Sequence, residues 1–119
     1  MKTSIDVQDH IILRTFTGVI HLDDIINSWK EIFSRFEDLS VFKGVITDML
    51  EAEMRLDDNN MNMLIDFLKG YMDRMEGTKI AIVTNTPQVT DTIMMDQRMK
   101  HVQIKSFSTL RLAFDWISG

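Results

Sequence analysis

The run from Lys79 to Val83 constrains the fold more than any other part of the sequence. It reads Lys-Ile-Ala-Ile-Val and shows no alternation of polar and apolar residues after its first position. A strand that is wet on one face alternates, whereas a strand buried on both faces is continuously apolar. The segment is therefore predicted to be a central strand in a sheet with helices packed on its faces.

Strand and helix patterns alternate along the rest of the chain. The opening segment, 4–18, predicts two strands around a turn near Gln8 and Asp9. The other predicted elements are a helix at 22–36, strands at 43–50, 77–85 and 102–107, and helices at 56–75, 87–100 and 108–117. The order β-β-α-β-α-β-α-β-α predicts an α/β protein with one mixed, mostly parallel five-stranded sheet and four helices packed on it. We expect a single domain over 1–119.

Composition and charge exclude several classes of function. The 119 residues carry a formal net charge of -5, which disfavours nucleic acid and anionic membrane surfaces as partners. The chain has no cysteine, so it has no disulfide, thiolate nucleophile or sulfur ligand for a metal. Neither a signal peptide nor an integral membrane segment is evident, because no apolar run approaches about 18 residues. Cytoplasmic residence is the expectation.

No set of residues in the sequence has the spacing of a catalytic or metal site. The three histidines are scattered, and no serine stands in a G-x-S-x-G elbow. The acidic residues between Asp48 and Asp58 lack the spacing and the glycine of a calcium loop, so we expect a solvated loop and helix start there. We therefore predict no catalytic residues, no metal, no cofactor and no enzymatic activity.

The turn Thr84-Asn85-Thr86-Pro87 has two interpretations. Backbone N–H groups at a helix N-terminus can bind an anion, and Thr84, Thr86 and Thr90 add hydroxyl groups. The turn lacks the glycines and lysine of a phosphate-binding loop, and a strand-to-helix corner with a capping threonine explains the same residues. The capped corner is the favoured interpretation, and the weak anion site is the alternative.

The predicted helix at 56–75 has a wider apolar surface than one small core requires. Its core stripe is formed by Met61, Leu64, Ile65, Leu68, Met72 and Met75. Met63, Phe67 and Tyr71 widen the apolar arc to about 200°, roughly double the usual core-facing stripe. The helix at 87–100 adds Met94 and Met95, and methionine is common where a surface adapts to varied partners or ligands. These five residues are the predicted interaction surface.

Three segments carry a family resemblance. They are "FTGVIHLDDI" at 16–25, "KGVITDM" at 43–49 and "IKSFSTLRLAFDWI" at 104–117, where Phe107, Ala113, Trp116 and Ile117 hold the positions of a final strand and helix. With the element order, they resemble the SpoIIAA-like family, which has the STAS fold of bacterial anti-sigma-factor antagonists and similarity to CRAL/TRIO lipid-binding proteins. Anti-sigma-factor antagonists place a phosphorylatable serine after the third strand. The segment 48–60 contains neither serine nor threonine, so the resemblance does not extend to the phospho-switch.

Two functions follow from these patterns. The resemblance implies a non-enzymatic regulatory or protein-interaction module that binds a protein partner or a second copy of itself through the helices at 56–75 and 87–100. The alternative is a binder of a small apolar molecule or lipid, held in a groove between or beneath these helices with its polar end at the Thr84–Thr90 turn. An enclosed cavity favours the ligand, and a flat exposed patch favours the partner.

Overall fold

The computed structural model describes residues 3–85, 98–99 and 101–119. Its centre is a five-stranded sheet of β1 (Thr3–Gln8), β2 (Ile11–Ile20), β3 (Gly44–Met54), β4 (Lys79–Val83) and β5 (Gln103–Phe107). The strands lie in the order β1-β2-β3-β4-β5, with β1 antiparallel to β2 and the other neighbours parallel. This arrangement confirms the predicted mixed, mostly parallel sheet.

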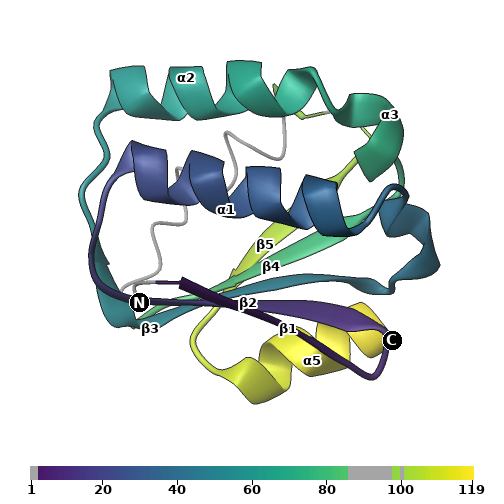
Figure 1. The fold of residues 1–119 in the computed structure, drawn as a ribbon. Helices are drawn as coiled ribbons and strands as arrows, with labels where there is room; N and C mark the ends of the chain where they lie inside the picture. Colours follow the sequence, from purple (N-terminus) through teal and green to yellow (C-terminus); the bar gives the residue numbers. More distant parts are fainter. Residues whose placement is uncertain (1–2, 86–97, 100) are drawn as a thin grey trace.

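Helices cover both faces of the sheet (Figure 1). The helices α1 (Leu22–Arg35) and α2 (Asp58–Lys69) lie side by side on one face, and α5 (Leu110–Ser118) lies on the other. Because parallel crossovers are right-handed, strands laid down in sequential order place their connecting helices on the same face. Two short elements, the 3₁₀ turn η1 (Leu39–Val41) and α3 (Met72–Met75), complete the described helices. The predicted helix at 87–100 falls mostly outside the described residues.

The two layers form two separate hydrophobic clusters. On the side of α1 and α2, buried residues include Ile12 and Phe16 of β2, Val45 of β3 and Ile80 of β4. On the side of α5, the buried residues are Ile11, Ile46, Ala81, Val83, Ala113 and Ile117. Thus β4 contributes to both clusters, which is why its sequence is continuously apolar.

The first helix and the hairpin match the sequence pattern closely. In α1 the side chains of Leu22, Ile25, Trp29, Ile32 and Phe33 are buried, as their spacing predicts. The β1–β2 turn is made by Asp9 and His10, which both have positive φ angles of 53° and 62°. Two consecutive positive φ values are what a type I′ hairpin turn requires.

Three element boundaries differ from the prediction. The strand predicted to end at 50 continues to Met54, because β2 is long enough to pair with it as far as Ile20. The predicted loop around Glu51 and Glu53 is therefore part of β3. The helix predicted over 56–75 is interrupted after Lys69, where Gly70 and Tyr71 form a turn before α3.

The last helix also begins differently from the prediction. The helix predicted to begin at Ser108 begins at Leu110 with Thr109 as its N-cap, and the Thr109 side chain accepts a hydrogen bond from the backbone N–H of Leu112. Serine and threonine serve this role by the same chemistry, so the sequence pattern does not separate two adjacent hydroxyl residues.

Gly44 sets the distance between β3 and β4 at the start of the sheet. A Cβ atom at this position would lie 2.6 Å from the carbonyl oxygen of Lys79 and 3.1 Å from Cγ2 of Ile117. The first of these contacts is with backbone, which cannot move away without disturbing the pairing of Gly44 with Lys79. Only glycine fits here without a shift of the strand or of α5.

We predict that Gly44→Ala lowers the free energy of unfolding by about 2 kcal/mol, because overpacking forces the backbone to shift. Gly70→Ala is the matched control: its φ of -68° suits alanine, and a Cβ there would make only an ordinary contact at 3.4 Å. The control should stay within about 0.5 kcal/mol of the parent. Chemical denaturation measures both values, and equal effects of the two substitutions would contradict the steric role of Gly44.

Candidate functional site

A charged side chain occupies a core position in β2. Alternation along the strand places Arg14 on the same face as Ile12 and Phe16, toward α1 and α2. Its exposed fraction is 4%, which matches that of the surrounding core. Arginine is almost never fully buried unless it is paired, so the surroundings of this side chain indicate what it does.

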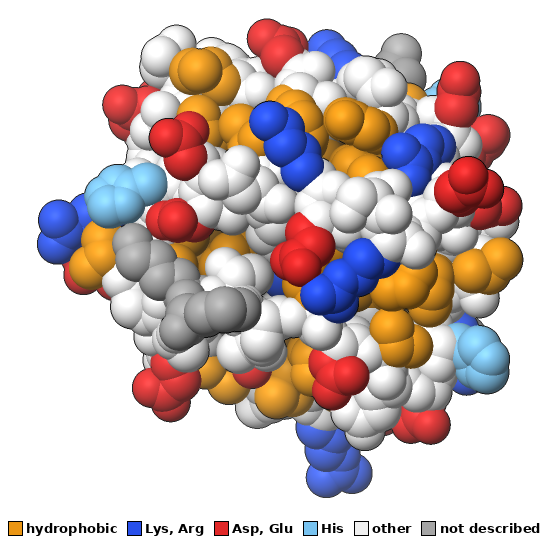
Figure 2. All heavy atoms as spheres, in the orientation of Figure 1, with side chains coloured by type: hydrophobic (Ala, Val, Ile, Leu, Met, Phe, Trp, Pro, Cys, Tyr) orange, Lys and Arg blue, Asp and Glu red, His pale blue; other side chains and the backbone are white. Residues whose placement is uncertain are grey.

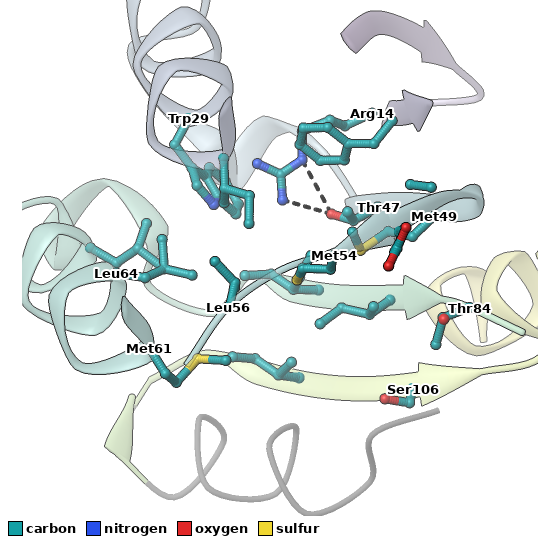
Figure 3. Close-up of a pocket in the computed structure, with 18 residues that line it drawn as sticks. Arg14, Trp29, Thr47, Met49, Met54, Leu56, Met61, Leu64, Thr84 and Ser106 are labelled. Atoms are coloured by element: carbon teal, nitrogen blue, oxygen red, sulfur yellow. Dashed lines mark hydrogen bonds between the residues drawn. The ribbon is translucent and has the colours of Figure 1, made fainter. Parts of the chain in front are cut away.

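The guanidinium group of Arg14 is held from three sides (Figure 3). Its Nε and Nη2 atoms donate to Oγ1 of Thr47 at 3.3 and 2.8 Å, across the β2–β3 pair in which these two residues are direct neighbours. The guanidinium carbon also lies 4.2 Å from the ring centre of Trp29 and 5.1 Å from that of Phe16. Stacking and hydrogen bonding together fix the orientation of the group.

The positive charge of Arg14 has no anionic partner in the described part of the chain. No carboxylate there forms an ion pair with it, and its buried Nη1 atom has no hydrogen-bond partner. Burial lowers the pKa of Arg14 from its ordinary value to about 9, because the charged form loses its hydration. The group therefore remains charged at neutral pH while its charge is unbalanced.

Arg14 lies in the wall of a cavity of about 280 Å³ between the sheet and the two helices. Most of the described lining side chains are apolar: Phe16, Ile25, Trp29, Met49, Ala52, Met54, Leu56, Met61, Leu64, Leu68, Ile80, Ile82 and Ile104. The others are Arg14, Thr47, Glu53, Thr84 and Ser106. An apolar cavity with a few polar groups is the usual composition of a small-molecule site.

A β-bulge shapes the cavity wall. The pairing of Thr15 with Asp48 is followed by that of Thr17 with Glu51, so β3 contains one more residue than β2 in this stretch. The extra residue reverses the alternation, and the even-numbered Ala52 and Met54 therefore line the same cavity as the odd-numbered Thr47 and Met49. Bulges of this kind commonly re-aim side chains at functional sites.

The polar residues of the wall follow one row of the sheet. Arg14 pairs with Thr47, Thr47 with Ile82, and Ile82 with Ser106. Thr84 follows at the end of β4, where its backbone N–H donates to the carbonyl oxygen of Phe107 at 3.1 Å. The row places hydroxyl groups on both sides of Ile82 and the guanidinium group at one end.

The structure places only part of the sequence-predicted anion site. Thr84 lines the cavity, whereas Thr86 and Thr90 lie outside the described residues. Sequence reasoning missed Arg14, the cation that an anion would meet here. The sequence does carry a signal, because Arg14 alternates in phase with the apolar Ile12 and Phe16, which are buried.

The structure describes three of the five residues of the predicted interaction surface and places them in different surroundings. Met63 is 50% exposed on α2. The ring of Tyr71 stacks on Phe33 of α1 with ring centres 4.1 Å apart, and Phe67 lies 5.2 Å from Tyr71. Met94 and Met95 lie outside the described residues. The second helix lines the cavity with Met61, Leu64 and Leu68, which belong to its predicted core stripe, and not with Met63, Phe67 or Tyr71.

Two further features of the described residues bear on function. No group of three or more histidine or acidic side chains in them is placed to hold a metal ion. Among the helices that the structure describes, none is long and apolar enough to cross a membrane.

Arg14 and Arg74 can be compared directly, because both guanidinium groups lie over aromatic rings. Arg74 lies over the ring of Phe33 at 5.0 Å, but it donates to the backbone carbonyl oxygens of Phe33, Phe36 and Glu37 at the end of α1. Its donors are thus used by the fold, whereas those of Arg14 are used only in part.

We predict that Arg14→Met raises the free energy of unfolding at pH 7 by about 1 to 3 kcal/mol, since a buried charge without an anionic partner is removed.

The direction of the Arg14→Met effect on stability follows from the lowered pKa of Arg14. The folded state binds the Arg14 proton less tightly than the unfolded state does, so the stability penalty is fully present below pH 9 and decreases only above it. Arg74→Met should instead lower the free energy of unfolding by about 2 kcal/mol, because three carbonyl oxygens lose a charged donor. Chemical denaturation at pH 7 compares the two variants. A loss of stability in Arg14→Met would assign Arg14 a purely structural role.

Comparisons with known proteins identify the fold. Searches against protein-family models and curated proteins found no match. Among solved structures, an uncharacterized DUF3478-family protein with a SpoIIAA-like fold from Shewanella loihica PV-4 is similar, with a TM-score of 0.65 at 16% identity over 97% of this chain and 91% of that one. An anti-sigma factor antagonist from Mycobacterium paratuberculosis gives 0.63 at 12% identity over 98% and 93%.

A third structure, the anti-sigma factor antagonist SpoIIAA in its unphosphorylated form, gives a TM-score of 0.55 at 10% identity over 98% of both chains. These likenesses extend over nearly the whole of each chain and concern the backbone arrangement. The chain therefore has the SpoIIAA-like, or STAS, fold of anti-sigma-factor antagonists.

Proposed function

We propose that this protein is a non-enzymatic binding module that takes a small amphipathic molecule into the cavity between its sheet and the helices α1 and α2. The observation that carries the proposal is the cavity itself, about 280 Å³ in volume, with an apolar wall and a buried guanidinium group at one side. An engineered apolar cavity of about 150 Å³ already binds benzene, so this volume is sufficient for a ligand.

The chemistry of the wall supports binding and offers no means of catalysis among the described residues. Among the described lining residues, the hydroxyl groups belong to Thr47, Thr84 and Ser106, and no histidine or cysteine is present to activate them. Of the two charged side chains, Arg14 is a donor only, and Glu53 is exposed and lies 3.5 Å from Arg55. Such a wall can orient a ligand and exclude water from it.

A small neutral fluorescent probe, 1-naphthylamine, tests the proposal, because its size matches the cavity volume. We predict that it binds the wild-type protein and that Leu64→Phe, which fills the cavity from α2, weakens binding by about tenfold or more. Met63→Phe is the control, because the neighbouring Met63 is exposed on the same helix and does not line the cavity. If Leu64→Phe disturbs the fold, Ala52→Leu fills the cavity from β3 instead.

Circular dichroism checks that each variant is folded, and the fluorescence titration then measures whether the probe binds in the cavity. Equal binding by wild type and both cavity-filling variants would place the probe elsewhere on the molecule. No binding by wild type would contradict the proposal directly.

A second candidate function is protein interaction through the outer side of α2. Two of the similar solved structures are anti-sigma factor antagonists by name, and α2 presents the exposed side chain of Met63. Figure 2 shows hydrophobic side chains reaching the surface in separate groups with charged side chains between them. A protein partner or a second copy of this chain would have to engage such a mixed surface.

We predict that Met63→Asp weakens association with a partner or between copies by about tenfold or more without loss of fold, because it buries a charge in the interface. The control is Leu112→Asp, since Leu112 is also 50% exposed but lies on α5, on the opposite face. Native mass spectrometry measures self-association and stable complexes. A wild-type protein that stays monomeric and unaccompanied would contradict this second function and leave the cavity proposal intact.

A further inference from the structure

The chemical class of the ligand follows from the unused donors of Arg14, on the condition that the cavity binds a ligand as proposed above. We infer that the ligand is an amphipathic carboxylate: one carboxylate group pairs with Arg14, and an apolar body of modest size fills the space between the sheet, α1 and α2. The inference depends on donor geometry, on the charge of the wall and on the cavity volume.

One edge of the buried guanidinium group lacks hydrogen-bond partners. Of its five N–H donors, Thr47 accepts one from Nε and one from Nη2, and Nη1 has no partner. The free donors therefore lie along the Nη1–Nη2 edge, which is the edge that binds a carboxylate through two parallel hydrogen bonds. The Thr47 bonds and the Trp29 ring, 4.2 Å from the guanidinium carbon, hold this edge in place before a ligand arrives.

The charge of the wall selects a single negative charge. Arg14 is the one cationic side chain among the described lining residues, and the other charged residue, Glu53, is an exposed carboxylate beside Arg55. A carboxylate neutralises Arg14. A phosphate monoester, with a charge of about -1.5 to -2 at neutral pH, would leave uncompensated negative charge in an apolar cavity, which is unfavourable.

The volume limits the size of the apolar body. A cavity of about 150 Å³ holds the six carbons of benzene, so 280 Å³ corresponds to roughly ten to twelve non-hydrogen atoms. Decanoate, with a ten-carbon chain, is a suitable probe of this class. Decan-1-ol has the same chain without the charge, and decyl phosphate has the same chain with a larger charge.

The test measures displacement of the small neutral probe 1-naphthylamine by these three compounds. We predict that decanoate binds the wild-type protein about 10- to 100-fold more tightly than decan-1-ol, as expected for a charge-assisted pair away from water. Arg14→Met should weaken decanoate binding by about 30-fold or more and leave decan-1-ol binding unchanged or tighter. Arg35→Met is the control, because Arg35 is an exposed residue paired with Glu31 and does not line the cavity.

Trp29 supplies a second readout that reports the position of the ligand. The chain has two tryptophans, and Trp116 lies on α5, on the opposite face of the sheet. In a Trp116→Phe background the emission therefore comes from Trp29 alone, which contacts both the cavity and Arg14. In the Trp116→Phe protein that retains Arg14, decanoate should change the Trp29 emission at the same concentration at which it displaces the probe.

The outcomes separate the two proposals. Equal binding of decanoate and decan-1-ol, with no effect of Arg14→Met, would overturn the carboxylate inference while the cavity remained a binding site. Tighter binding of decyl phosphate than of decanoate would overturn the assignment of a single negative charge. Failure of the neutral probe and of all three compounds to bind would overturn the proposed function together with this inference.

Discussion

The parallel pairing of β2 with β3 is the interaction on which the rest of the structure depends. It joins the opening hairpin to the central strands, and it extends from Ile11 and Gly44 to Ile20 and Met54. The same ladder sets Arg14 beside Thr47, and its irregularity after Thr15 turns the end of β3 toward the cavity. A shorter pairing would still form a sheet, but it would lack both the bulge and the wall that the bulge provides. Fold and candidate site therefore share one structural cause.

Arg14 and Arg74 make similar contacts with aromatic rings but use their hydrogen-bond donors differently. Both guanidinium groups lie over aromatic rings, with Arg74 near Phe33 and Arg14 near Trp29. Arg74 gives its donors to carbonyl oxygens at the end of α1, which the helix itself cannot satisfy. Arg14 gives two donors to one threonine, and its buried Nη1 atom has no hydrogen-bond partner. A buried group that lacks a partner reduces stability, and the carboxylate ligand proposed above would supply that partner.

Much of the fold is predictable from the sequence, because strong periodic patterns determine it. The continuous apolar run of β4 and the stripe of α1 define a covered sheet, and the element order predicts its mixed pairing. The end of β3 is not predictable, because its polar residues pair with β2 through backbone groups that side-chain patterns do not report. At the interruption after Lys69, Tyr71 packs against Phe33 of α1, a tertiary contact that a local sequence pattern does not report. The inward position of Arg14 is the main feature that the sequence pattern did not predict. A charged residue in a strand is normally expected to face solvent, and only its alternation in phase with Ile12 and Phe16 indicates that it faces the core.

One fold can carry different functions, because function resides in side chains placed on a shared scaffold. Similar solved structures named as anti-sigma factor antagonists share the backbone of this chain at 10 to 12% identity, which is a likeness of scaffold and not of side chains. The segment 48–60 has no hydroxyl residue to phosphorylate, so a phospho-switch at the start of α2 has no acceptor in this sequence. The inner side of α2 instead carries cavity residues such as Leu64, and its outer side carries Met63. If both proposed functions hold, α2 is the element through which occupancy of the cavity would reach a partner, since a ligand can shift an equilibrium only through contacts that differ between two states.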